Sequence, residues 1–285
     1  MLDWLAARGV DRANLKRMSG YSNQVFLVEH ENAALSVLRA PDRGVPSGLC
    51  PLAHDTARVF KIHQDVAELG LAPKVIEADL QTGIMWLEYA GEPHPLAKDN
   101  FVQWRGMISR LQQSGLDWRE AGAQEHDGAG LKYLRQLSDS APTSNGQVYA
   151  DELLSLGLSR GYADYPLVPV HGDLNPGNCL YYNACDRWFA IDWDFAGMRV
   201  AEWEYAALIV EHGWNIEWAE AFANKINRAD LSWFCAMFAL WSWEWHVQRE
   251  SAAEVIAQKW RIVEYWFECV NLGCINVIKP QERLY

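Results

Sequence analysis

The sequence has few of the features that mark membrane proteins, disulfide frameworks or zinc sites. Its 285 residues include no run of eighteen apolar residues and no basic-apolar segment at the start. The six cysteines are scattered, without the Cys-x-x-Cys spacing that is typical of zinc sites. We therefore expect reduced, mostly buried thiols in a cytoplasmic protein that has no membrane partner.

Positive charge is also scarce, since 25 Lys and Arg face 37 Asp and Glu and the net charge is −12. Nucleic acids attract surfaces rich in Lys and Arg, so we expect no nucleic-acid partner. The acidic balance favours a cationic substrate, although acidity also serves solubility alone. With 50% hydrophobic and 22% charged residues, the composition is that of a globular protein large enough for two lobes.

Tryptophan, in contrast, is abundant, and six of the 15 lie between Trp233 and Trp266. Apolar residues recur there at helical spacing, which indicates that most of these rings form a core between helices. The alternative is that a few of them line an acceptor pocket, because aromatic faces bind a desolvated amine cation with about 2 kcal/mol or more. Glu244 would add an opposite charge between two tryptophans. We therefore take Trp241, Glu244 and Trp245 as candidate substrate-binding residues.

The most informative segment reads Val170-His-Gly-Asp-Leu-Asn-Pro-Gly-Asn-Cys179. Asp173 can accept a proton from a hydroxyl group, and Asn178 lies five residues further on, the step found in the kinase catalytic loop. The Asn175-Pro-Gly turn can fold the loop back so that both side chains face one pocket. His171 is a candidate catalytic residue, but a hydrogen-bonding role that shapes the loop fits it better than proton transfer.

A second cluster, Ile191-Asp-Trp-Asp194, follows a predicted hairpin formed by residues 179–182 and 188–191. The hairpin would carry Asp192 back beside Asn178. Magnesium prefers oxygen ligands, so these two residues are candidate metal ligands. In an extended segment Asp194 would share a face with Asp192 and reach a second ion. Either cluster alone is common in loops, whereas the ordered pair indicates phosphoryl transfer.

Together, the two clusters resemble the signature of the aminoglycoside phosphotransferase and choline kinase superfamily, and the likeness is strongest to bacterial choline/ethanolamine kinases and thiamine kinases. The resemblance implies an α+β, two-lobed, protein-kinase-like fold that uses ATP and Mg²⁺. An antiparallel sheet with one helix would form the nucleotide-binding lobe at residues 1–90. A mainly helical catalytic and acceptor-binding lobe would follow at residues 91–285, with ATP between the lobes.

The same resemblance implies nucleotide-binding residues in the first lobe. A small polar loop can present backbone N–H groups to phosphates. Arg39 ends a predicted strand, in the position from which family members contact the phosphates, and its planar fork suits them. Backbone groups of the hinge would bind adenine. The candidate residues are Ser19, Gly20, Ser22, Asn23, Arg39, Leu87, Glu88 and Tyr89.

One departure from the kinase pattern concerns the partner of Arg39. Kinases pair this cation with a helix glutamate, but the matching position holds Val59. Asp55, Asp65 and Glu68 are the nearby acids, and the sequence does not decide among them.

The periodicity and breaker residues predict the remaining elements. Strands are expected at residues 24–28, 35–39 and 84–89, and loops at 115–130 and 141–146. Helices are expected at 3–8, 56–69, 101–113, 128–138, 202–211 and 214–226, before a final aromatic pair.

The leading hypothesis is an ATP- and magnesium-dependent kinase that phosphorylates the hydroxyl of a small cationic metabolite, of the choline/ethanolamine or thiamine type. An aminoglycoside or sugar kinase on the same scaffold is the second hypothesis, and a catalytically silent nucleotide-binding module is the third. The complete set of Asp173, Asn178 and Asp192 argues against the third. The sequence does not identify the acceptor alcohol, the oligomeric state or the number of metal ions.

Overall fold

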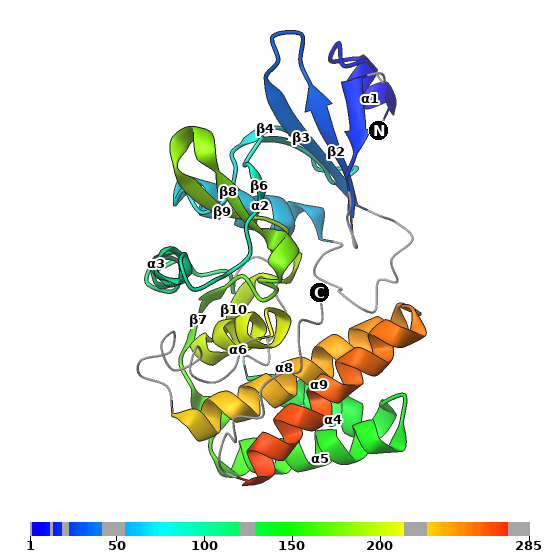
Figure 1. Ribbon diagram of the computed structural model, residues 1–285, viewed down its shortest axis with the longest axis vertical. Helices are drawn as coiled ribbons and strands as arrows, with labels where there is room; N and C mark the ends of the chain where they lie inside the picture. The colour runs from blue at the N-terminus through cyan, green and yellow to red at the C-terminus, as the bar shows by residue number, and fades with distance from the viewer. Residues whose placement is uncertain are drawn as a thin grey trace. The chain divides into compact units, whose positions relative to one another are not determined.

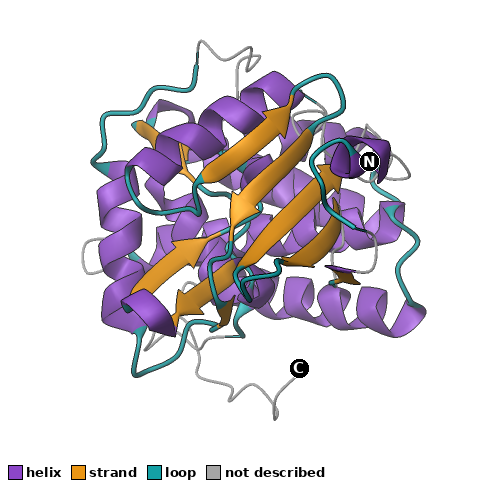
Figure 2. Ribbon diagram, turned by 90° about the horizontal axis from the view of Figure 1, so that it is seen from above, coloured by secondary structure: helices purple, strands orange, loops and turns teal. Residues whose placement is uncertain are grey.

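The computed structural model describes residues 2–11, 14–18, 23–41, 55–119, 129–213 and 227–272. The chain forms two compact units, and each is discontinuous in sequence. Unit 1 comprises Met1–His94 and Cys179–Phe195, and unit 2 comprises Pro95–Asn178 and Ala196–Tyr285. Figure 2, with helices in purple and strands in orange, shows the α+β composition expected from the sequence.

Unit 1 is built on a five-stranded sheet with the strand order β1-β2-β3-β5-β4 (Figure 1). Every neighbouring pair of strands is antiparallel. The strands are β1 (Leu15–Arg17), β2 (Asn23–Glu29), β3 (Leu35–Pro41), β4 (Val75–Asp79) and β5 (Ile84–Glu88). The helices of this unit are α1 (Leu2–Ala6) and α2 (Thr56–Glu68). The side chain of Asp55 caps α2 by accepting a hydrogen bond from the N–H of Arg58.

The two faces of this sheet bury different clusters, because side chains alternate along a strand. Leu38 of β3 packs with Leu5 of α1 on one face. Val59 of α2 packs with Met85 and Leu87 of β5 on the other. Arg39 pairs with Met85 across the ladder, so it lies on the α2 face.

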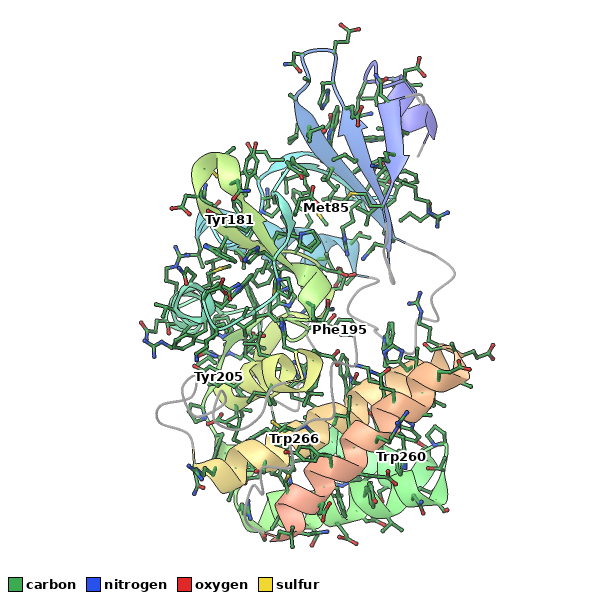
Figure 3. All side chains as sticks on the ribbon, viewed as in Figure 1. Met85, Tyr181, Phe195, Tyr205, Trp260 and Trp266 are labelled. Atoms are coloured by element: carbon green, nitrogen blue, oxygen red, sulfur yellow. The ribbon has the colours of Figure 1, made fainter. Side chains whose placement is uncertain are left out.

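A hairpin late in the sequence also belongs to unit 1. It consists of β8 (Cys179–Tyr182), the 3-10 turn η4 (Asn183–Cys185) and β9 (Arg187–Ala190), with the short strand β6 (Glu92–Pro93) beside β8. The N–H of Ala190 donates to the carbonyl of Leu71, 2.8 Å away. In Figure 3, Tyr181 lies on this hairpin, and Phe195 ends the 3-10 turn η5 (Trp193–Phe195) that follows it. The predicted hairpin is therefore confirmed.

Unit 2 is mainly helical. Its helices are α3 (Phe101–Gln112), α4 (Leu131–Ser140), α5 (Ser144–Ser159), α6 (Ala201–Glu211), α8 (Arg228–Gln248) and α9 (Ala253–Leu272), with short 3-10 turns η2 (Tyr162–Asp164) and η3 (Pro176–Asn178). Strands β7 (Leu167–Val170) and β10 (Gly197–Val200) pair antiparallel. Helix α8 packs against α9, α6 and α5, as the orange, yellow and green ribbons of Figure 1 show.

The aromatic residues of α8 confirm the helical core expected from their spacing. Trp233, Phe234 and Phe238 are fully buried, and the indole N–H of Trp233 donates to the carbonyl of Leu153, 2.9 Å away. Trp266 of α9, labelled in Figure 3, is buried as well. None of the helices within the described residues is long and apolar enough to cross a membrane.

The expectation of a loop at residues 141–146 is wrong, because α5 begins at Ser144. Thr143 is the N-cap of α5, and its hydroxyl accepts a hydrogen bond from the N–H of Gly146, 3.1 Å away. A Cβ atom at Gly146 would lie 3.2 Å from the ring of Trp243, so glycine serves close packing here. The predicted helix at 214–226 lies outside the described residues.

Candidate active site

The segment from His171 to Asn178 forms a tight loop after β7. The buried imidazole of His171 accepts a hydrogen bond at Nδ1 from the backbone N–H of Asp173, at 3.2 Å. His171 therefore fixes the backbone that carries Asp173, which is the loop-shaping role that the sequence favours for it. The Asp173 side chain is half-buried.

The structure brings Asn178 against Asp173. The Nδ2 amide of Asn178 lies 2.9 Å from the carbonyl oxygen of Asp173 and 3.4 Å from its Oδ2 atom. Asn175 folds the loop by accepting from the N–H of Gly177 at 2.9 Å and donating to Oδ2 of Asp173 at 3.2 Å. With Nδ2 turned toward Asp173, the amide oxygen of Asn178 is the atom suited to bind a cation.

Helix α6 supports this loop at three points that the sequence does not reveal. The carboxylate of Glu204 accepts the backbone N–H of His171. The indole N–H of Trp203 donates to the carbonyl of Gly172, at 3.3 Å. The imidazole of His212, at the end of α6, lies 3.0 Å from the carbonyl of Leu174. Side chains of α6 and of its C-cap residue thus hydrogen-bond to the backbone of the loop that carries Asp173.

Glu204 is a fully buried acid that the motif analysis missed. Burial raises the pKa of Glu204 to about 7, although the N–H groups of His171 and Gly172 and the charge of Arg199 act in the opposite direction. Its Oε1 atom has no hydrogen-bond partner within the described residues. The sequence does not mark Glu204 as a site residue, because the backbone that it contacts lies thirty-three residues earlier in the chain.

Ionisation of Glu204 should make stability depend on pH. The native state holds the Glu204 proton more tightly than the unfolded chain, whose glutamates have the ordinary pKa of 4.5. The contribution of Glu204 to the free energy of unfolding is therefore expected to fall as pH rises from about 4.5 to about 7. Glu204→Gln cannot ionise, so the free energy of unfolding of the variant should rise relative to that of the parent protein across this range. Urea denaturation at several pH values measures the difference.

The matched control for this prediction is Glu254→Gln, which removes an exposed carboxylate from α9. The control should keep the pH slope of the parent protein. Equal slopes for the parent and Glu204→Gln would show that Glu204 does not change protonation in this range.

The second cluster, in unit 1, does not have the extended backbone expected from its sequence. Asp192 has φ +63°, in the left-handed region, and the 3-10 turn η5 follows at once. The carboxylates of Asp192 and Asp194 nevertheless lie on the same two partners, because both contact Asn23 and Arg39. A non-glycine residue in this backbone region is uncommon and concentrates at functional sites.

The partner of Arg39 is this aspartate pair. Its Nη2 atom forms an ion pair with the buried carboxylate of Asp194 and lies 3.4 Å from Oδ1 of Asp192. Burial alone would lower the pKa of Arg39, but the two carboxylates outweigh burial and raise it. Of the acids that the sequence offers as partners, Asp55 caps α2 and Asp65 pairs with Lys61. Asp192 and Asp194 thus provide the carboxylates that pair with Arg39, and no glutamate of α2 forms an ion pair with it among the described residues.

The donor set fits a magnesium ion. Asp192 and Asp194 bring two negative charges and Arg39 one positive charge, which leaves a local excess of negative charge for a cation. Mg²⁺ is commonly held by one or two carboxylates together with water and substrate phosphates. No group of three or more His, Cys, Asp or Glu side chains suited to a metal occurs among the described residues. Two carboxylates, completed by water and phosphate oxygens, would suit such an ion.

The remaining nucleotide-binding candidates are only partly described. Ser19, Gly20 and Ser22 lie outside the described residues. Leu87 and Glu88 end β5, and the N–H of Glu88 donates to the carbonyl of Lys74 at 2.9 Å. Tyr89 follows, with its hydroxyl donating to Glu92. The adenine-binding role of these backbone groups stays a prediction.

The three acceptor candidates lie on α8 and are half-buried. The ring of Trp241 packs edge-on against Trp203, with the centroids 6.2 Å apart. Glu244 accepts hydrogen bonds from the hydroxyl of Tyr133 and from Nε2 of Gln248. Trp245 has the guanidinium of Arg249 above its ring, 4.9 Å from the centroid. The face of Trp245 therefore already contacts a cation.

A family model described as the phosphotransferase enzyme family matches residues 15–245, which is most of the chain. This chain belongs to that family. The match confirms the superfamily resemblance expected from the loop at His171–Asn178 and the cluster at Ile191–Asp194. Among curated proteins, none matches this phosphotransferase in sequence.

Solved structures show the same fold for the phosphotransferase. Choline kinase LicA from Streptococcus pneumoniae has a TM-score of 0.74 at 16% identity, over 94% of this chain and 99% of LicA. A choline/ethanolamine kinase family protein from Mesorhizobium loti gives 0.63 at 19%, over 96% and 100%. A thermostable mutant of aminoglycoside phosphotransferase APH(4)-Ia gives 0.66 at 14%, over 94% and 98%. The predicted protein-kinase-like fold class is therefore confirmed.

Proposed function

We propose that this phosphotransferase transfers a phosphoryl group from ATP, with Mg²⁺, to the hydroxyl of a small cationic metabolite of the choline/ethanolamine or thiamine type. Asp173 is the residue that orients the acceptor hydroxyl and accepts its proton. The loop geometry supports this role for Asp173. Its backbone N–H donates to His171, its carbonyl accepts from Asn178, and its carboxylate accepts from Asn175. A base must be held in position before its proton affinity matters.

In this proposal, Asn178 and Asp192 hold the magnesium ion, and Asp194 assists. The bound ion neutralises charge on the phosphates and orients them. Arg39 supplies the protein's own positive charge beside the two aspartates. The polar loop that ends at Asn23 binds phosphate through backbone N–H groups.

One chain of contacts carries the proposal for the acceptor. Trp241 packs against Trp203, and the N–H of Trp203 binds the carbonyl of Gly172, which directly precedes Asp173. The half-buried ring of Trp241 is therefore linked, within unit 2, to the loop that carries Asp173. Glu244 lies one helical turn from Trp241 on α8, and such a pairing of ring and carboxylate suits an amine cation.

A coupled ADP-release screen with Mg²⁺ tests the function. Its acceptors are choline, ethanolamine, thiamine, amino sugars and aminoglycosides. Turnover of a compact cationic alcohol supports the proposal. Turnover of aminoglycosides or sugars alone would contradict the compact cationic acceptor and would support an aminoglycoside or sugar kinase. Magnesium-dependent ATP binding without turnover of any alcohol would indicate a silent nucleotide-binding module.

Substitutions on α8 test the cationic acceptor directly. Trp241→Ala, Glu244→Gln and Trp245→Ala are each expected to raise the KM of the acceptor. A lost cation–π face costs about 1–2 kcal/mol, which is roughly tenfold in affinity, and Glu244→Gln removes the opposite charge. The KM of ATP should stay nearly unchanged. We expect the smallest effect at Trp245, whose ring already faces Arg249.

The comparison includes a neutral isostere of the best acceptor, in which carbon replaces the charged nitrogen. The parent enzyme should discriminate against this isostere, and the three variants should discriminate less. Trp260→Ala, on the neighbouring helix α9, serves as the aromatic control and should leave the discrimination unchanged. Equal treatment of charged and neutral acceptors by the parent enzyme would rule out a cation pocket.

A further inference from the structure

The amide group of Asn23 makes the same contact with both aspartates of the second cluster. Its Nδ2 atom lies 3.1 Å from Oδ1 of Asp192 and 3.1 Å from Oδ2 of Asp194. The Asn23 side chain is buried. One amide nitrogen therefore bridges two carboxylates that are separated by one residue in sequence.

The sheet explains why Asn23 reaches the aspartates. Val25 lies opposite Arg39 and Asn23 lies opposite Pro41 in the β2–β3 ladder. Residues two apart on a strand share a face, so Asn23 and Arg39 are diagonal neighbours on one face. The two side chains approach Asp192 and Asp194 from neighbouring strands.

Charge and backbone geometry both show why such a bridge is needed. Two carboxylates held close together repel each other, and Arg39 compensates only one of the two charges. Asp192 also has the left-handed backbone conformation, which persists only where surrounding contacts hold it. The N–H bonds from Asn23 stabilise both carboxylates in their charged form and fix their separation.

We propose that Asn23 is a positioning residue that sets the spacing of Asp192 and Asp194 and thereby the affinity of the enzyme for its divalent cation. This inference rests on the proposed metal role of the two aspartates. It differs from the phosphate-binding role that the sequence indicates for Asn23, because here the side chain acts on the aspartates and not on the nucleotide. The same residue links strand β2 to the metal ligands.

A magnesium titration of the Asn23→Ala variant tests the inference. At saturating ATP, the Mg²⁺ concentration for half-maximal ADP release should rise about tenfold, since two hydrogen bonds to charged groups are lost. The KM of the acceptor should not change. Asn23→Ser keeps one small donor and should give an intermediate rise. The control is Asn32→Ala, in an exposed turn of the same unit, where the Asn32 side chain accepts the N–H of Ala34.

A measurement without turnover separates this inference from the proposed function. Melting temperatures are recorded in increasing MgCl₂ with ATP present and no acceptor. The parent enzyme should be stabilised by magnesium, and Asn23→Ser should need more magnesium for the same stabilisation. A parent enzyme that does not respond to magnesium would contradict the proposed metal role. A responsive parent with an unshifted Asn23→Ser titration would overturn the role of Asn23, even if Asn23→Ala does not fold.

Discussion

Replacing Asp173 with asparagine is expected to lower kcat by at least 10²–10⁴-fold, the typical contribution of general base catalysis. Asparagine keeps the size of the side chain and can still hydrogen-bond within the loop, but it cannot accept the proton of the acceptor hydroxyl. ATP binding should persist, because the nucleotide-binding candidates of unit 1 are untouched. Single-turnover phosphorylation and nucleotide titration measure the two effects separately.

The matched control is Asp139→Asn, which makes the same change at an exposed position of α4. It should leave kcat at the parent value. Circular dichroism establishes that Asp173→Asn is folded. Near-normal turnover in the folded variant would remove Asp173 from the role of base.

Replacing Asp192 with alanine is expected to abolish magnesium-dependent nucleotide binding, while acceptor binding is changed less. The variant removes one of two carboxylates from the cluster and leaves Arg39 with Asp194 as its main partner. Asn178→Ala should weaken binding in the same direction but less, because a neutral oxygen compensates less of the metal's charge. Titration of Mg²⁺ against nucleotide binding and activity measures both.

A second variant controls for backbone strain at Asp192. Alanine tolerates the left-handed region less well than aspartate or asparagine. Asp192→Asn keeps that backbone preference but lacks the charge, so it should also lose most of the metal dependence. If Asp192→Asn and Asn178→Ala both titrate with magnesium like the parent enzyme, the metal assignment is wrong.

The elements found from sequence are those with local signals. The hairpin at 179–190 consists of two short, aromatic-rich runs around a polar turn, and α2 has a regular apolar face, so the sequence predicts both. Helix α5 was missed because Pro142, Asn145 and Gly146 are turn formers, and the Thr143 cap did not outweigh them. The buried contact of Gly146 with Trp243 depends on packing ninety-seven residues away.

In the candidate site as well, the sequence predicts the contacts between residues close in the chain but not those between distant residues. Asp173 and Asn178 are linked by a short loop whose turn residues can be recognised in the chain. In contrast, the contacts of Arg39 with Asp194 and of Glu204 with His171 join residues far apart in sequence. The kinase pattern favours a helix acid as the partner of Arg39, and only the folded structure shows that Asp192 and Asp194 provide the carboxylates. Long-range pairing of this kind leaves no periodic pattern.

The discontinuity of unit 1 limits how the protein can be divided for experiments. A fragment that ends at His94 would contain the five-stranded sheet but not the hairpin at Cys179–Phe195. In such a fragment β6 would lose its partner β8, and the buried guanidinium of Arg39 would lose both of its counterions. An unpaired buried charge is costly. Unit 1 is therefore best expressed with residues 179–195 joined to residues 1–94, for example through a circular permutation.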